Sequence, residues 1–92
     1  MHGEYKQIGG KLVVVDFIVK DDAIRQVSLA GDFFLYPDDI LSRWREALEG
    51  APAASTREEL ITRLRGALAE GDELFGVDPE AVATAIDRGF ER

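Results

Sequence analysis

The sequence predicts an α+β domain in which a small antiparallel sheet of about three strands carries about three helices packed on one face. Strand-like segments rich in β-branched residues fill the first 36 residues, and apolar side chains at helical spacing fill the rest. Strands that precede helices, instead of alternating with them, favour helices segregated to one side of an antiparallel sheet. A length of 92 residues suits a single domain, residues 1–92.

The first third of the chain is expected to form three strands joined by short turns. Residues 11–20 (KLVVVDFIVK) and 23–30 (AIRQVSLA) have strand composition, and the KDDA stretch at 20–23 between them favours a turn. Residues 3–8 (GEYKQI) are predicted as a third strand that reaches the first long one through a glycine turn.

The longest predicted strand is apolar on both faces. Its alternate residues from Val13 to Val19 form one face, and Leu12, Val14 and Ile18 point to the other. If all helices cover one face, these three side chains line an uncovered apolar surface, which normally requires a partner. The sequence therefore predicts an interaction surface there.

The first helix is predicted within residues 36–50 (YPDDILSRWREALEG). Pro37 suits a first helical turn, the two following aspartates suit the positive end of the helix dipole, and Gly50 is a typical stop.

Two further helices have recognisable starts. Thr56 and Glu59 form a capping box, and the helix that follows is expected to end near Gly71. Asp78 and Pro79 are a cap and a first-turn proline for a third helix, which is predicted to run to the end of the sequence.

Composition excludes several function classes. The absence of cysteine removes disulfides and thiolate chemistry and favours a reducing, cytoplasmic setting. The net charge of −7 repels phosphates, so we expect neither nucleic acid nor a membrane surface as the main partner. The sequence shows no apolar stretch of about 18 residues and no secretion-signal pattern.

The sequence contains no pattern that predicts a catalytic residue or a set of metal ligands. The one histidine, His2, lies in a terminal segment, and most carboxylates fall on helix faces directed to solvent. The GGK of residues 9–11 is not a phosphate loop. Tyr5 stands where that motif needs its first glycine, Leu12 stands where it needs Ser or Thr, and a strand follows where it needs a helix. Two interpretations of Lys11 remain open. Its charge either discourages the sheet edge from pairing with another chain, or meets a phosphate supplied by a partner.

The stretch AGDFFLYPDD at 30–39 contains two adjacent aromatic rings. Gly31 and Asp32 are expected to fix a bend at the end of the hairpin, Asp32 by bonding nearby backbone amides. Of Phe33 and Phe34, one belongs in the core, because adjacent residues of an extended chain point to opposite faces. The other ring, with residues 35–36, either covers the sheet or docks a partner.

These motifs together resemble the small C-terminal domain of lipoate–protein ligases, and more closely the stand-alone form of that domain in ligases split into two chains. The resemblance rests on GGKL entering an apolar strand, on IRQVSLAGDFF, and on a proline-started helix that closes in ALEG. It covers residues 6–50, and LFGVDPEAVATAI is compatible with the family's last helix. Trp44 departs from the leucine expected in the first helix, and Ile8 stands where a proline is frequent.

The resemblance implies the role of an accessory subunit that binds no cofactor alone. Ligases of this family join lipoate to ATP, release pyrophosphate and pass the lipoyl group from lipoyl-adenylate to a lysine of a lipoyl domain. The partners implied are the catalytic ligase chain and, indirectly, lipoyl-domain proteins, with ATP and lipoate bound in the complex. The small domain acts as a cover that is needed for the first step.

The resemblance also assigns positions in this sequence. Gly9, Gly10 and Lys11 match the family turn that lies near the partner's adenylate site, and residues Gly31 to Phe34 match the signature after the hairpin. Together with the apolar sheet face, it makes Leu12, Val14, Ile18 and Tyr36 the predicted interface.

Two alternatives come from other function classes. The same small α+β shape resembles sulfur-acceptor and iron–sulfur assembly scaffolds, although the lack of cysteine argues against that chemistry. The second alternative is a small-molecule sensor, or a homodimer that buries its own sheet face.

Overall fold

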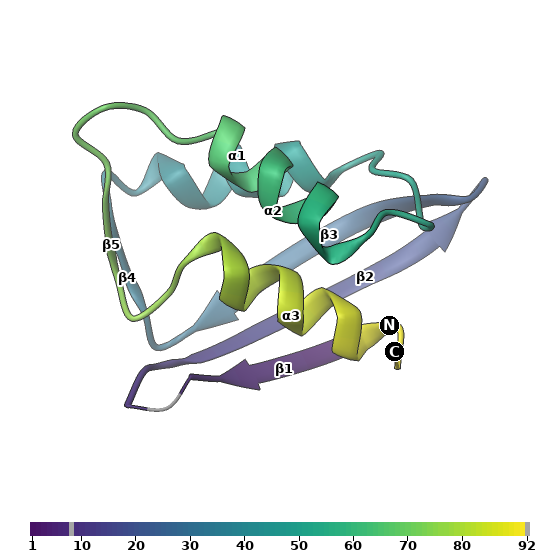
Figure 1. Cartoon of the computed structure of the whole chain (residues 1–92), viewed down its shortest axis with the longest axis horizontal. Helices are drawn as coiled ribbons and strands as arrows, with labels where there is room; N and C mark the ends of the chain where they lie inside the picture. Colours follow the sequence, from purple (N-terminus) through teal and green to yellow (C-terminus); the bar gives the residue numbers. More distant parts are fainter. Residues whose placement is uncertain (8, 92) are drawn as a thin grey trace.

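The computed structural model describes residues 1–7 and 9–91 and confirms the α+β class. Three helices cover one face of a three-stranded antiparallel sheet, and a separate two-stranded sheet lies at one end (Figure 1). The main sheet has the order β1-β2-β3, with β1 (His2–Lys6), β2 (Leu12–Lys20) and β3 (Ala23–Gly31). The small sheet pairs β4 (Phe34–Tyr36) with β5 (Glu73–Phe75), and the helices are α1 (Asp39–Leu48), α2 (Arg57–Gly66) and α3 (Pro79–Gly89).

The β2–β3 hairpin follows the predicted segments, with one irregularity. The register between the strands shifts between Asp16 and Ile18, where Gln26 has a φ of 54°. This bulge lets Ile24 and Val27, three residues apart on β3, both face the core. The Glu49 carboxylate accepts the Gln26 N–H at 2.6 Å and so satisfies a donor at the sheet edge.

The first strand is shorter than predicted. β1 ends at Lys6, and of the predicted 3–8 segment, Ile8 lies outside the described residues. Across β2, the side chains of Val13, Val15 and Phe17 are at most 2% exposed, as the alternation predicts.

The prediction that Pro37 opens the first helix is wrong. The chain is still extended at Tyr36, which pairs with Glu73 of β5, so α1 begins only at Asp39 with Asp38 as its N-cap residue. The pairing with a distant segment overrides the local preference of proline for a first helical turn.

The capping box of α2 is confirmed. The Glu59 N–H donates to Thr56 Oγ1 at 3.1 Å, and the Thr56 N–H donates to the Glu59 carboxylate at 2.9 Å. These bonds lower the pKa of Glu59, because they stabilise the charged carboxylate. The predicted end near Gly71 is wrong: α2 ends at Gly66, and the Arg43 guanidinium binds the Ala67 carbonyl just beyond it.

The third helix has the predicted start. Asp78 Oδ1 accepts the Ala81 N–H at 2.8 Å, Pro79 occupies the first turn, and the helix ends at Gly89, near the expected position. Phe90 follows it and packs on Phe17 with 4.9 Å between ring centroids.

The core lies between the sheet and the helices. Helix α3 packs on β1 and β2, α1 packs on β3, and α2 packs against both helices. Trp44 is fully buried at the centre of this layer, and its Nε1 donates to the Leu64 carbonyl at 3.1 Å. The helix and strand side chains that are fully buried with it include Val13, Val15, Ile40, Leu48, Leu60 and Leu64.

Candidate interaction site

The predicted GGK loop turns tightly and presents an exposed lysine. The Gly10 N–H donates to the Gln7 carbonyl at 2.9 Å, and Gly9 has a φ of 72°. The stem of Lys11 lies on Gly76, directly after β5: a Cβ on Gly76 would come within 2.3 Å of the Lys11 Cγ. Gly76 also has a φ of 81°, so both its backbone and its contact with Lys11 favour glycine. The loop is therefore anchored to the small sheet.

The two sequence motifs meet in space. Asp32 Oδ1 accepts the N–H of Leu12 at 2.8 Å, and Gly31 pairs with Val13 at the end of the hairpin. The hydrogen bond shown for Asp32 thus reaches 20 residues back along the chain, beyond the nearby backbone amides that a local bend would use. It ties the GDFF segment to the strand that follows Lys11.

The adjacent rings separate as the alternation predicts. Phe33 is half-buried and packs against the core, whereas Phe34 is 58% exposed. Of the following residues, Leu35 is 6% exposed and belongs to the core, and Tyr36 is 60% exposed. Leu35 therefore takes no part in an exposed surface.

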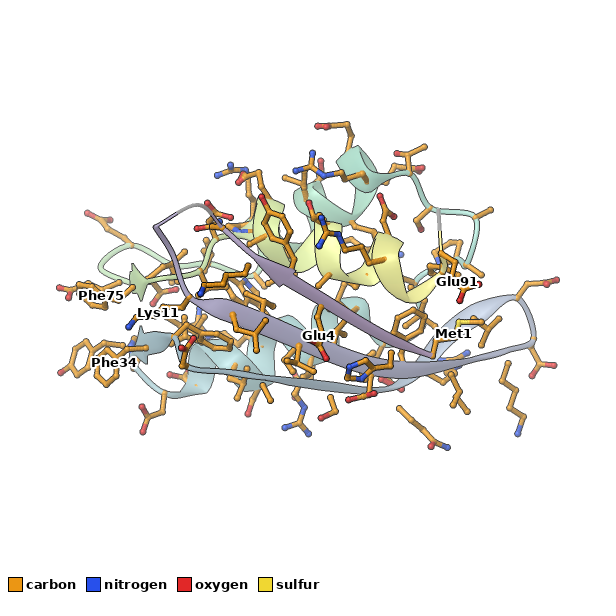
Figure 2. The ribbon with its side chains drawn as sticks, turned by 90° about the horizontal axis from the view of Figure 1, so that it is seen from below. Met1, Glu4, Lys11, Phe34, Phe75 and Glu91 are labelled. Carbon is orange, nitrogen blue, oxygen red and sulfur yellow. The ribbon has the colours of Figure 1, made fainter. Side chains whose placement is uncertain are left out.

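The second strand of the small sheet adds a ring that the sequence analysis did not identify. Phe75 of β5 pairs with Phe34 of β4, with 5.8 Å between the ring centroids, and is 49% exposed. We call the exposed side chains of Phe34, Tyr36 and Phe75 the aromatic patch. Figure 2 shows Phe34 and Phe75 at the same end of the molecule as Lys11, away from Met1 and Glu91.

The sheet face opposite the helices is mixed in character. Of the predicted interface residues, Leu12 and Val14 are half-buried and Ile18 is 39% exposed. Charged side chains lie among them: His2 contacts the carboxylates of Glu4 and Asp16, each at 2.7 Å. These two hydrogen bonds, to Glu4 first, raise the pKa of His2.

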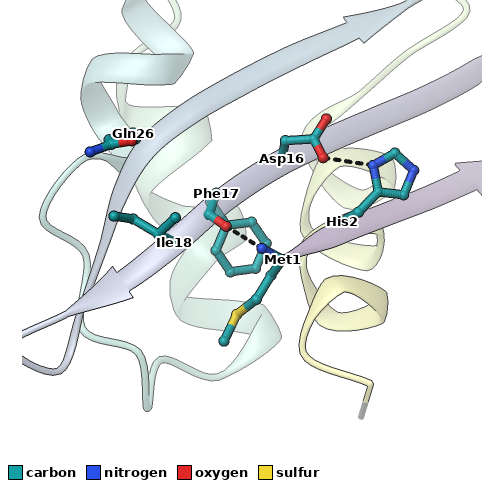
Figure 3. Close-up of a pocket in the computed structure, with 6 residues that line it drawn as sticks. All are labelled: Met1, His2, Asp16, Phe17, Ile18 and Gln26. Carbon is teal, nitrogen blue, oxygen red and sulfur yellow. Dashed lines mark hydrogen bonds and ion pairs between the residues drawn. The ribbon is translucent and has the colours of Figure 1, made fainter.

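The far end of this face contains an open depression of about 450 Å³ (Figure 3). It is bordered by the His2–Asp16 pair and by Phe17, whose carbonyl accepts a bond from the Met1 ammonium. Met1, which lines this depression, lies away from the end of the molecule that carries Lys11, Phe34 and Phe75 (Figure 2). The depression belongs to neither of the two sequence motifs.

An ion pair missed by the sequence analysis holds the segment that leads into β5. Arg43 of α1 makes a two-pronged contact with Asp72, at 2.8 and 3.1 Å, and also binds the Ala67 carbonyl at 2.8 Å. Asp72 in turn accepts the Ala69 N–H at 2.7 Å and is only 7% exposed. The Arg43 bonds, followed by the Ala69 bond, lower the pKa of Asp72.

Replacing Asp72 with asparagine is expected to destabilise the protein in a pH-dependent way. Because its folded-state pKa is depressed, the carboxylate stabilises the fold above its unfolded pKa of about 3.9, and this contribution is lost as pH falls through the folded-state value. Urea midpoints of wild type and Asp72→Asn should therefore differ at pH 7, and the difference should begin to shrink as pH falls below about 4. Asp39→Asn removes the charge of the other carboxylate that Arg43 contacts, which is 66% exposed, and is the control with little effect. A gap that persists unchanged to pH 2 contradicts the assignment.

Within residues 1–7 and 9–91, no cluster of three or more histidine, aspartate or glutamate side chains could hold a metal ion. None of the helices in the described part of the chain is long and apolar enough to cross a membrane.

Comparison with known proteins gives a whole-chain likeness to one lipoylation system. Neither protein-family models nor curated proteins match this sequence. Among solved structures, the chain is similar to a chain of an archaeal lipoylation system from Thermoplasma acidophilum, which consists of a bi-partite lipoate protein ligase and its E2 lipoyl domain. The identity is 26% and the TM-score 0.70, over 94% of this chain and 97% of that chain. The two chains thus have almost the same length and the same fold.

Proposed function

We propose that this chain is the accessory subunit of a two-chain lipoate–protein ligase. It assists a catalytic chain in forming lipoyl-adenylate from lipoate and ATP, and so supports lipoylation of lysines on lipoyl domains. It binds no cofactor alone, and ATP and lipoate bind in the complex. The observation that carries the proposal is the whole-chain likeness to a chain from a bi-partite ligase system.

The arrangement of the two motifs supports this role. The GGK loop precedes β2 and the GDFF segment follows β3, so both lie at the open end of the β2–β3 hairpin, where the Asp32–Leu12 bond joins them. This end carries Lys11 and exposed aromatic rings. The predicted partner-proximal residues Gly9, Gly10 and Lys11 thus lie beside a surface suited to protein contact.

The physical benefit of such a subunit is the exclusion of water. Lipoyl-adenylate is a mixed anhydride, formed when the lipoate carboxylate displaces pyrophosphate from ATP. Water that reaches it releases free lipoate and AMP. A domain that covers the site during activation and moves aside for transfer prevents this loss, which explains why a subunit without catalytic residues is needed.

A second candidate is the acceptor of the lipoyl group. The same archaeal system includes an E2 lipoyl domain, so a chain similar to one of its components could correspond to that part. An acceptor would itself become lipoylated on one of its three lysines, Lys6, Lys11 or Lys20.

Reconstitution with the catalytic ligase chain from the same genome tests the proposal. Pyrophosphate release from ATP and lipoate should be strong with both chains and near background with either alone. Intact-mass measurement of this chain after the reaction should show no lipoyl adduct, while a separate lipoyl domain gains one. Absence of stimulation contradicts the accessory role, and a lipoyl adduct on this chain supports the acceptor instead.

A further inference from the structure

Resting on the proposed function, we propose that the aromatic patch is the anchor by which this chain docks on the catalytic ligase chain. The facing surface of that chain is then an apolar socket with basic groups at its rim. This goes beyond the predicted contact through the sheet face, because it places the main contact on the small β4–β5 sheet.

The patch is exposed although its surroundings are well packed. Its three rings are 49–60% exposed, while Leu35, between two of them on β4, is 6% exposed. The two strands therefore direct one row of side chains into the core and the other row outward. Aromatic side chains held in this way are typical anchors of protein interfaces, because they bury a large area with little loss of conformational freedom.

Several contacts hold the patch in place. The Arg43–Asp72 ion pair fixes the segment before β5, and Lys11 packs on Gly76 immediately after it. The opposed rings of Phe34 and Phe75 brace the two strands against each other. A preformed patch binds with a smaller ordering cost than a flexible one.

Charge argues for a different protein over a second copy of this chain. Glu73 lies opposite Tyr36 across the small sheet, and Asp38 and Phe34 border the same depression of about 230 Å³. A two-fold dimer through the patch brings these carboxylates close to the acidic surface of a second copy, and each copy carries a net charge of −7. A partner with basic residues around an apolar socket avoids this repulsion.

The test compares the affinity of patch variants for the catalytic ligase chain by calorimetry. Phe34→Ala combined with Phe75→Ala should raise Kd at least about 30-fold, as expected when interface anchors are removed. Phe34→Tyr combined with Phe75→Tyr keeps both rings and should retain most of the affinity. Affinity of the wild type should also fall as salt is raised from about 0.05 M to about 0.5 M. Urea unfolding of each variant checks that the fold is intact.

The outcomes separate this inference from the proposed function. If the wild type neither binds nor stimulates the catalytic chain, the proposed function fails. If the wild type stimulates the catalytic chain but the Phe34/Phe75 alanine variant binds it equally well, the aromatic patch is not the anchor. The same holds if Ile18→Ala alone causes the loss of affinity, because the sheet face is then the contact. A wild-type homodimer that the alanine variant dissociates also overturns the inference, because the occupant is then a second copy.

Discussion

Replacing Trp44 with alanine is expected to lower the free energy of unfolding by about 3–5 kcal/mol, the usual cost of removing a large aromatic side chain from a core. The side chain is 0% exposed and lies where α1 meets α2. A domain of this size is stabilised by roughly 5–14 kcal/mol in total, so the loss is a large share of its stability. Far-UV circular dichroism during urea unfolding measures it, since the substitution removes the only tryptophan.

Trp44→Phe is the matched control for the hydrogen bond. Phenylalanine keeps part of the buried volume but cannot donate to the Leu64 carbonyl, which still accepts from the Ala67 N–H at 3.2 Å. Because this carbonyl keeps a partner, the control should cost distinctly less than the alanine variant. Equal losses for both variants would show that the hydrogen bond, and not the packing, dominates at this position.

Gly3→Ala is the second substitution with a large expected effect, about 1–3 kcal/mol of destabilisation through overpacking. A Cβ at Gly3 would come within 1.9 Å of the Ala85 carbonyl oxygen and 2.6 Å of the Gly89 nitrogen. Both are backbone atoms of α3, so the helix must move away from β1. The sheet then loses part of the cover that its core face needs.

Gly66→Ala provides the opposite case in the same protein. Gly66 is the last residue of α2, and a Cβ there would meet nothing within 4 Å. Alanine is the better helix former by up to about 1 kcal/mol, so this variant should be slightly more stable. Urea midpoints measure both effects, and a midpoint that does not fall for Gly3→Ala would contradict the close contact between β1 and α3.

Much of the fold follows from local signals in the sequence. The turn residues of the hairpin, the Thr56–Glu59 box and the Asp78–Pro79 start all act within a few residues, and the structure has each of them. The predicted bounds are wrong where contacts between distant segments determine the local structure. Strand β4 pairs with β5 from almost 40 positions further along the chain, and each has only three residues, too few for a periodic pattern.

The candidate site could be predicted only in part for the same reason. The two motifs lie on the hairpin, so their residues were visible as local patterns, and the uncovered sheet face followed from alternation. Phe75 and the Arg43–Asp72 pair carry no such pattern, because their partners are remote in sequence. The adjacent Phe33 and Phe34 indicated that one of the two rings is exposed. They gave no indication that Phe75 of β5 lies opposite it.

The sheet face opposite the helices is less apolar than the alternation of β2 alone implies. His2, Glu4 and Asp16 form a polar network beside the apolar side chains, and β1 contributes two of these three residues. The aromatic patch is the more exposed apolar surface, with three large rings against Ile18 and the terminal Met1 on the sheet face. This difference is why we place the docking anchor on the small sheet.

Sedimentation velocity of this chain with and without the catalytic ligase chain tests the account most directly. We expect the 10.2 kDa chain to sediment alone as a monomer and, when mixed in equal amounts, to move with the catalytic chain as a single larger species. A stable homodimer that never sediments with the catalytic chain would contradict the account, because such a particle needs no partner.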